Sequence, residues 1–187
     1  MVAADAALEA ITKLANTIDA IPSQNGSLTY TGSAQTPSWN SFNPDALEIG
    51  GDTSGINAGT YTATFTPKEN YTWGDGTNDA RSVTWTIGRA AIAAAPVQSG
   101  SLTYTGQAQT PSWSNYNTAQ LTISGTTSAT EAGSHSAMFT PTANYQWSDG
   151  STAARSISWT IGRAVITGTP AQSGSLTYTG STQTPSW

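Results

Sequence analysis

The sequence predicts an all-β protein in which antiparallel β-sandwiches follow one another in tandem behind a short N-terminal α-helix. Three observations lead to this fold class. A motif that ends in Gln-Thr-Pro-Ser-Trp occurs at Trp39, Trp113 and Trp187, with a constant period of 74 residues between positions 39, 113 and 187. A fixed period of this kind is typical of an array of structural repeats. Within each repeat apolar residues alternate with threonine or serine, whereas the first residues are rich in alanine and leucine.

The period divides the chain of 187 residues into four parts. We expect a docking helix in residues 1–16, one sandwich in residues 17–88 (unit one), a second in residues 89–162 (unit two) and an incomplete third repeat in residues 163–187. The third repeat has no counterpart of unit two from Ser114 onward. Two explanations stay open: the chain is the beginning of a longer repeat protein, which we favour, or these strands complete the sandwich of a neighbouring molecule.

The N-terminal helix is predicted from its composition, because residues 3–16 are mostly strong helix formers and contain neither glycine nor proline. Its apolar stripe consists of Leu8, Ile11, Leu14 and Ile18. A helix of this length is not stable alone in water, so it requires its own sandwich, symmetry mates in a bundle or a larger assembly. Because Ile92 aligns with Ile18, the repeat also predicts a first strand over residues 17–21, which ends the helix near Asn16.

Strands are predicted where apolar residues recur at every second position, with a threonine-rich face toward solvent. The strand positions of unit one are Leu28 and Tyr30; Leu47 and Ile49; Tyr61, Ala63 and Phe65; and Val83, Trp85 and Ile87. Glycine-containing turns separate them, and unit two repeats the pattern. One apolar face on each sheet indicates that two sheets pack against each other.

Composition excludes several classes of function. The formal charge of −5 and the absence of any basic cluster argue against a nucleic-acid partner. The sequence has no apolar run of the length that membrane insertion requires. It also has no cysteine, which excludes disulfides, thiolate metal sites and cysteine nucleophiles.

Several motifs in order resemble those of the bacterial Ig-like repeats. They are Leu-Thr-Tyr-Thr-Gly at residues 28–32, the run at residues 58–67, Asn-Tyr-Thr-Trp at residues 70–73 and Trp-Thr-Ile at residues 85–87. Such repeats occur on bacterial surface proteins and on virion proteins of tailed phages, and the resemblance covers residues 17–187. It implies Ig-like sandwiches that serve as stalks, decorations or glycan binders.

Aromatic residues are the candidate contacts for a glycan or a protein partner. Trp85 and Trp159 lie inside alternating strand patterns and are predicted to be core. The tryptophans that flank the Asp-Gly turns are expected to be more open, and two loop aromatics are the best candidates for an exposed contact. The candidate contacts are therefore Phe42, Tyr116, Trp73 and Trp147.

No residue pattern predicts catalysis, a metal or a cofactor. Asp75 precedes a glycine and is followed by Arg81, which indicates a turn whose carboxylate caps backbone amides and pairs with the arginine. A calcium site needs several carboxylates, but Asp79 aligns with Ala153 in unit two. His135 is the only histidine and aligns with a strand tyrosine, whose place we expect it to fill. The protein is therefore predicted not to be an enzyme.

These observations favour a structural protein at the surface of a phage particle, as a decoration, fibre or tail-associated protein. The N-terminus lacks the pattern of a secretory signal, and a virion protein needs none because lysis releases it. We expect the helix to bind other virion proteins, the chain to be a homo-oligomer, and the projecting units to bind host glycans weakly and multivalently. The alternatives are a stalk segment of a bacterial surface adhesin, at the cell surface or extracellular, and a free carbohydrate-binding module.

Overall fold

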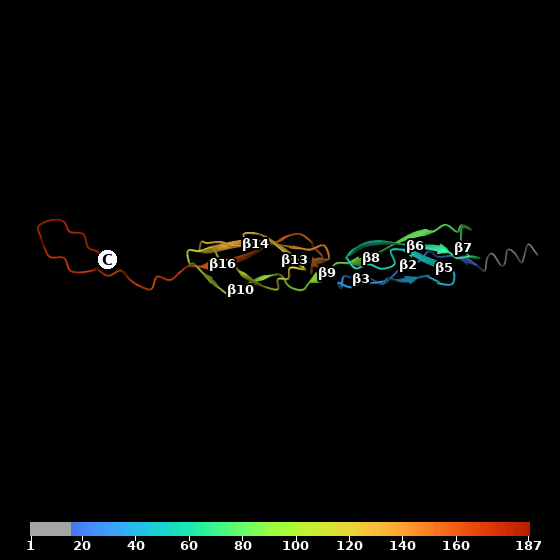
Figure 1. Ribbon diagram of the computed structural model, residues 1–187, viewed down its shortest axis with the longest axis horizontal. Helices are drawn as coiled ribbons and strands as arrows, with labels where there is room; N and C mark the ends of the chain where they lie inside the picture. The colour runs from blue at the N-terminus through green and yellow to red at the C-terminus, as the bar shows by residue number, and fades with distance from the viewer. Residues whose placement is uncertain (1–15) are drawn as a thin grey trace, which may run out of the picture.

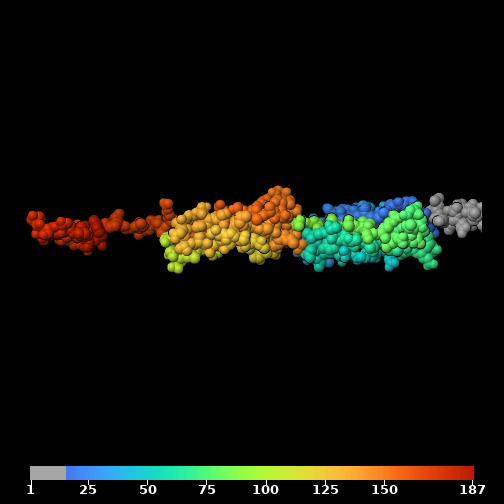
Figure 2. All heavy atoms as spheres, turned by 90° about the horizontal axis from the view of Figure 1, so that it is seen from above, coloured from blue at the N-terminus to red at the C-terminus, as the bar shows by residue number. Residues whose placement is uncertain are grey.

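The computed structural model describes residues 16–187, which form strands and connecting turns without a helix among them. Two similar units lie end to end along the long axis, and residues 163–187 extend beyond the second (Figure 1). The space-filling view shows the two units meeting directly and the last segment as a thin extension (Figure 2). The expected helix, with Leu8, Ile11 and Leu14, lies outside the described residues.

Unit one contains the first eight strands, β1 to β8. They are β1 (Thr17–Ile18), β2 (Ser23–Asn25), β3 (Leu28–Thr29), β4 (Ser38–Asn40), β5 (Leu47–Gly51), β6 (Gly59–Pro67), β7 (Thr72–Trp73) and β8 (Arg81–Gly88). A four-stranded sheet has the order β3-β8-β6-β5, and two further pairs are β1–β7 and β2–β4. The strands predicted from alternation are β3, β5, β6 and β8, and each is confirmed.

Unit two repeats this arrangement with strands β9 to β16. They are β9 (Ala90–Ile92), β10 (Val97–Ser99), β11 (Leu102–Thr103), β12 (Ser112–Ser114), β13 (Leu121–Gly125), β14 (Gly133–Pro141), β15 (Tyr145–Trp147) and β16 (Arg155–Gly162). Its four-stranded sheet has the order β11-β16-β14-β13, and its pairs are β9–β15 and β10–β12.

Each unit has its own aromatic core between the four-stranded sheet and the two-stranded pairs. In unit one Phe65 and Trp85 from the large sheet are buried together with Trp73 from β7. Trp39 from β4 closes the opposite side, with its ring edge-to-face on Phe65 at a centroid distance of 4.9 Å. The arrangement is that of the β-sandwich class, and an equivalent cluster fills unit two.

Two strand pairs in each unit are parallel, which differs from the expectation of purely antiparallel sheets. The strands β1 and β3 run parallel to β7 and β8, and β9 and β11 run parallel to β15 and β16. The central pairs β5–β6 and β6–β8 are antiparallel, as expected. Alternation reveals which face of a strand is buried, but not the direction of its partner. A parallel pair needs a long connection, which the full length of each unit supplies.

Ile18 lies in β1 and not on a helix, which corrects its assignment to the helix stripe. It pairs with Trp73 and packs, half-buried, against the core of unit one. The strand begins at Thr17 as predicted but ends at Ile18, where its pairing with Trp73 of β7 ends. Ile21 is consequently 47% exposed.

Residues 163–187 repeat the start of a unit without the rest of its core. Ile166 is 90% exposed, whereas the equivalent Ile92 is 2% exposed. Tyr178 and Trp187 are 92% and 74% exposed. An isolated bridge between residues 173 and 186 still closes the local loop, as the pairs β2–β4 and β10–β12 do in the complete units. The loop therefore keeps this bridge without a core that covers it.

Candidate functional site: the junction between the units

Trp73 and Trp147 were expected to be more open, and this expectation is wrong, because each is only 1% exposed. The Trp73 indole N–H donates to the Asp79 carbonyl at 2.8 Å, so its polar edge is satisfied within the turn. The guanidinium of Arg81 covers the Trp73 ring at 4.6 Å, a cation–π arrangement that Arg155 repeats over Trp147 at 4.5 Å. Neither indole face is available to a sugar ring.

Trp85 and Trp159 are buried in the core as predicted, at 1% exposure each. The Trp85 indole N–H donates to the Asp52 carbonyl at 2.7 Å, and that of Trp159 to the Thr126 carbonyl at 2.8 Å. A buried indole needs such a partner, because an unpaired N–H in the core is costly.

Phe42 and Tyr116 are half-buried and pack on core phenylalanines. The ring of Phe42 lies 5.5 Å from that of Phe65, and the ring of Tyr116 lies 5.3 Å from that of Phe139. Only part of each ring is therefore open to solvent. A contact between these residues and a glycan stays a prediction.

The Asp75 turn has the capping geometry that the sequence predicts. Asp75 Oδ1 accepts hydrogen bonds from the Thr77 backbone N–H at 3.0 Å and from the Thr77 hydroxyl at 2.7 Å, and Oδ2 lies 2.5 Å from Arg81 Nη2. The Thr77 hydrogen bonds, followed by Arg81, lower the pKa of the Asp75 carboxyl. Within residues 16–187 there is no group of His, Asp and Glu side chains that could hold a metal ion, nor a helix long and apolar enough to cross a membrane.

His135 takes the place of Tyr61, as the repeat alignment predicts. The Tyr61 ring stacks on Trp85 at 4.5 Å, and its hydroxyl donates to the Asn57 carbonyl at 2.7 Å. The His135 ring lies 4.6 Å from that of Trp159, and its Nε2 lies 2.9 Å from the Glu131 carbonyl oxygen. Both rings thus hold the loop that precedes the longest strand of their unit.

The side chain of Asn144 bridges the two units. Its Oδ1 accepts a hydrogen bond from the Ala58 backbone N–H at 2.8 Å, and its Nδ2 donates to Asn57 Oδ1 at 3.0 Å. Its own carbonyl accepts from the Ala90 N–H at 2.9 Å, where the chain enters β9. One residue of unit two therefore binds both the end of unit one and the first strand of its own unit.

Two further contacts fix the orientation of the junction. Arg89, the residue between β8 and β9, donates from Nε to the Ala143 carbonyl of unit two at 3.0 Å. The rings of Tyr30 and Tyr145 meet edge-to-face, with a centroid distance of 5.4 Å and an angle of 76° between their planes. Together with the Asn144 hydrogen bonds, these contacts link the two units at several points.

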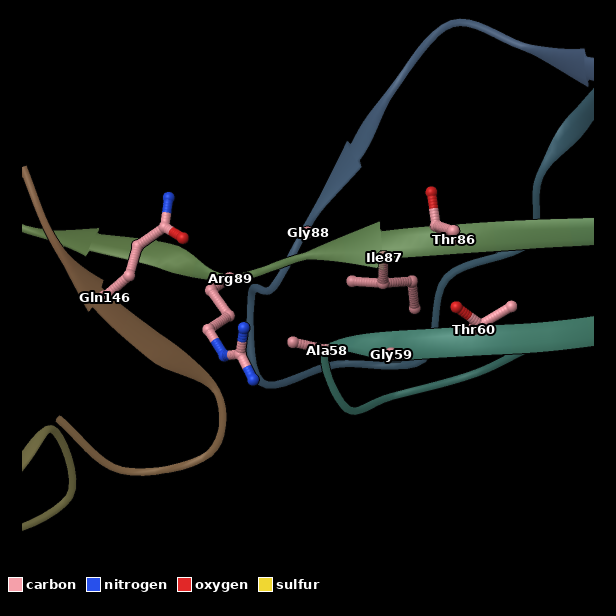
Figure 3. A pocket seen from close by; sticks show the side chains of 8 residues that line it. All are labelled: Ala58, Gly59, Thr60, Thr86, Ile87, Gly88, Arg89 and Gln146. Atoms are coloured by element: carbon pink, nitrogen blue, oxygen red, sulfur yellow. The ribbon is translucent and has the colours of Figure 1, made fainter. Parts of the chain in front are cut away.

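A shallow hollow lies at this junction (Figure 3). It is lined by Ala58, Gly59, Thr60, Thr86, Ile87, Gly88 and Arg89 of unit one and the connection, and by Gln146 of unit two. Arg89 is the only ionisable side chain in this lining, so the hollow offers no paired acid and base. The arrangement suits a mechanical joint better than a catalytic site.

The repeat boundary places Arg89 between the two units, whereas no motif predicts the contacts of Asn144, for which the period gives one signal. The dipeptide Asn-Tyr occurs at positions 70–71 and again at 144–145, one period apart.

Gln24 and Gln98 also recur at the period. The Gln24 side-chain amide pairs with both backbone groups of Thr86, at 3.0 and 2.9 Å, as a neighbouring strand would.

The candidate site is therefore a joint between two sandwich units, formed mainly by backbone groups, Asn144 and Arg89. Comparison of the chain with family models, with curated proteins and with solved structures finds no match.

Proposed function

We propose that the chain is a non-enzymatic structural protein of a phage particle, in which tandem Ig-like sandwiches project outward and residues 1–16 attach to other virion proteins. The observation that carries the proposal is the junction, where Asn144 and Arg89 hold two similar units end to end. A rod of sandwiches displays its far end at a distance from its attachment point, which is what a decoration or fibre protein requires.

The assignment of Ig-like units is supported by the ordered motifs of the sequence and by the sandwich-class fold. Each unit has its own core, and the threonines of β6 and β8 alternate with the buried residues of these strands. The side chains of the two tryptophans that flank the Asp-Gly turns are buried, so neither offers a ring to a sugar. These features favour a structural role over a carbohydrate-binding module.

The test is the composition and structure of purified particles. Mass spectrometry should detect the protein, and cryo-EM should place residues 1–16 at the particle and residues 163–187 away from it. A chain without residues 1–16 should fold but no longer join the particle. Absence from purified particles, together with recovery from the bacterial cell surface, would favour the second candidate, an adhesin stalk, for which the same rod geometry is suitable.

Glycan binding by the projecting units is a separate part of the proposal, and it depends on Phe42 and Tyr116. If these half-buried rings contact sugars, the double variant Phe42→Ala and Tyr116→Ala should lose its signal on a glycan array. The control is Val97→Ala, which shortens an apolar side chain that is 58% exposed elsewhere on unit two. Equal loss of signal in the control would argue against a specific aromatic contact.

A further inference from the structure

The far end of unit two corresponds in the repeat to the surface that receives Asn144 at the end of unit one. Positions one period apart correspond as follows: Tyr104 to Tyr30, Glu131 to Asn57, Ala132 to Ala58, and Arg163 to Arg89. We call these four residues, three from unit two and Arg163 directly after it, the distal socket. They line one shallow hollow together with Ala164, which corresponds to Ala90.

Among residues 16–187 no group occupies the distal socket. Tyr104 is 38% exposed, whereas Tyr30 is half-buried under the ring of Tyr145. The backbone N–H of Ala132 and the guanidinium of Arg163 donate to no described residue, although their counterparts Ala58 and Arg89 bind unit two. Within the described residues, the Ala132 N–H, the Arg163 guanidinium and the Tyr104 ring face of the distal socket therefore have no bound partner.

The chemistry of the distal socket fits an asparagine followed by a tyrosine. The Ala132 N–H can donate to the amide oxygen, as the Ala58 N–H does to Asn144. Glu131 takes the repeat position of Asn57, whose side chain accepts from Asn144, and a carboxylate accepts a stronger hydrogen bond than an amide oxygen. The open Tyr104 ring suits an edge-to-face contact with the tyrosine.

We propose that the distal socket is the docking site for a third Ig-like unit whose first strands are residues 164–187, seated through the Asn-Tyr corner that corresponds to residues 144–145. Residues 164–187 supply the residues of a third core that the structure leaves exposed, including Ile166 and Trp187. The proposal extends the structural role proposed above, and it holds whether or not the chain belongs to a phage particle.

A tethered unit is a better occupant than a second copy of the chain for two reasons. The occupied junction has two side-chain hydrogen bonds and one ring contact between the units, and a third hydrogen bond from the connecting residue Arg89. This is too little to offset the lost freedom of two separate molecules. Arg163 directly follows β16, so a third unit would be held at a high effective concentration. The corresponding corner of a second copy, at residues 70–71, has a different backbone, because Asn70 has a φ of 72° whereas Asn144 has no positive φ.

The test completes the third unit on the full chain by joining a second copy of residues 114–162 directly after Trp187, which continues the repeat in register. NMR should show a folded third core, and hydrogen exchange of the Ala132 amide should slow by at least about tenfold relative to the chain of 187 residues. Replacing the added copy of Asn144 by alanine, or Arg163→Ala, should abolish this protection. Replacing the added copy of Ser148 by alanine is the matched control, since Ser148 is exposed at the same end of its unit.

A folded third unit with unchanged exchange at Ala132 would overturn the proposal. So would protection of Ala132 in the original chain that grows with protein concentration and is lost in Asn70→Gly, because the occupant would then be a second copy. If the joined third unit does not fold, the same measurement is made with residues 164–187 replaced by a copy of residues 90–162. Lack of protection in this version as well would also overturn the proposal.

Discussion

The ring of Tyr61 lies against the backbone of Gly55 so closely that a Cβ added to this glycine would come within 2.4 Å of Tyr61 Cζ. In unit two the corresponding residues are Ala129 and His135. A larger residue at the first position thus accompanies a smaller ring at the second, while each ring keeps its place on a core tryptophan. The two positions act as one packing unit.

This coupling predicts a compensating pair of substitutions. Gly55→Ala alone should destabilise unit one by about 1–3 kcal/mol, because the Cβ overpacks a rigid ring. The double variant Gly55→Ala and Tyr61→His reproduces the pair of unit two and should recover most of that loss. The free energy of opening, measured by hydrogen exchange at the amides of Ala63 and Phe65, checks this. Simple additivity of the two single changes would contradict the coupling.

The junction predicts that Asn144→Ala loosens the rod without unfolding either unit. The change removes two hydrogen bonds, worth about 1–3 kcal/mol together, from the contact between the units. Small-angle scattering should show a shorter and broader distribution of lengths, while the melting of the two cores stays unchanged.

The control for Asn144→Ala is Asn70→Gly, which removes the corresponding side chain at the other end of the rod. Glycine suits the φ of 72° at this position, so the variant should fold well and keep the length of the wild-type rod. Freely tumbling units in the wild-type chain would show that the junction contacts do not restrain it.

The long strands could be predicted from the sequence, but the short ones could not. The strand β6, with nine residues, and β8, with eight, show several cycles of alternation, and alternation reports directly which face is buried. The strands β1 and β7 have two residues each, too few to show a period. Their positions are set by pairing with distant segments, which local sequence does not specify.

The candidate site was harder to predict than the fold, because its residues act through contacts that no motif describes. Trp73 was expected to be more open since it flanks a turn, but the turn carbonyl and Arg81 cover it. Asn144 and Asn70 occupy equivalent positions in the repeat, and yet within residues 16–187 only Asn144 contacts a second sandwich. The period identifies both asparagines as candidates for a junction contact. The order of the units along the rod decides which of them contacts a preceding unit.

Core tryptophans should differ sharply from the exposed tryptophan in their effect on stability. Trp85→Ala and Trp159→Ala should each cost about 3–5 kcal/mol, typical of a truncated core aromatic. Trp187→Ala, at a residue that is 74% exposed, should change the melting temperature little. Thermal unfolding of the three variants checks this, and an unchanged melting temperature in Trp85→Ala would contradict its place in the core.

The stability of the Asp75 turn is expected to depend on pH. Its carboxyl has a pKa below the ordinary value of 3.8, because the Thr77 hydrogen bonds and Arg81 favour the charged form. Because the pKa is lowered in the folded state, the charged carboxylate stabilises the turn at pH values above the ordinary pKa of the group. This contribution is lost as the pH falls through the lowered pKa. Thr77→Ala, which removes the largest cause, should raise the pKa toward 3.8 in an NMR titration of the carboxyl carbon. Arg81→Gln should raise it less, and a larger shift in Arg81→Gln than in Thr77→Ala would show that the ion pair dominates instead.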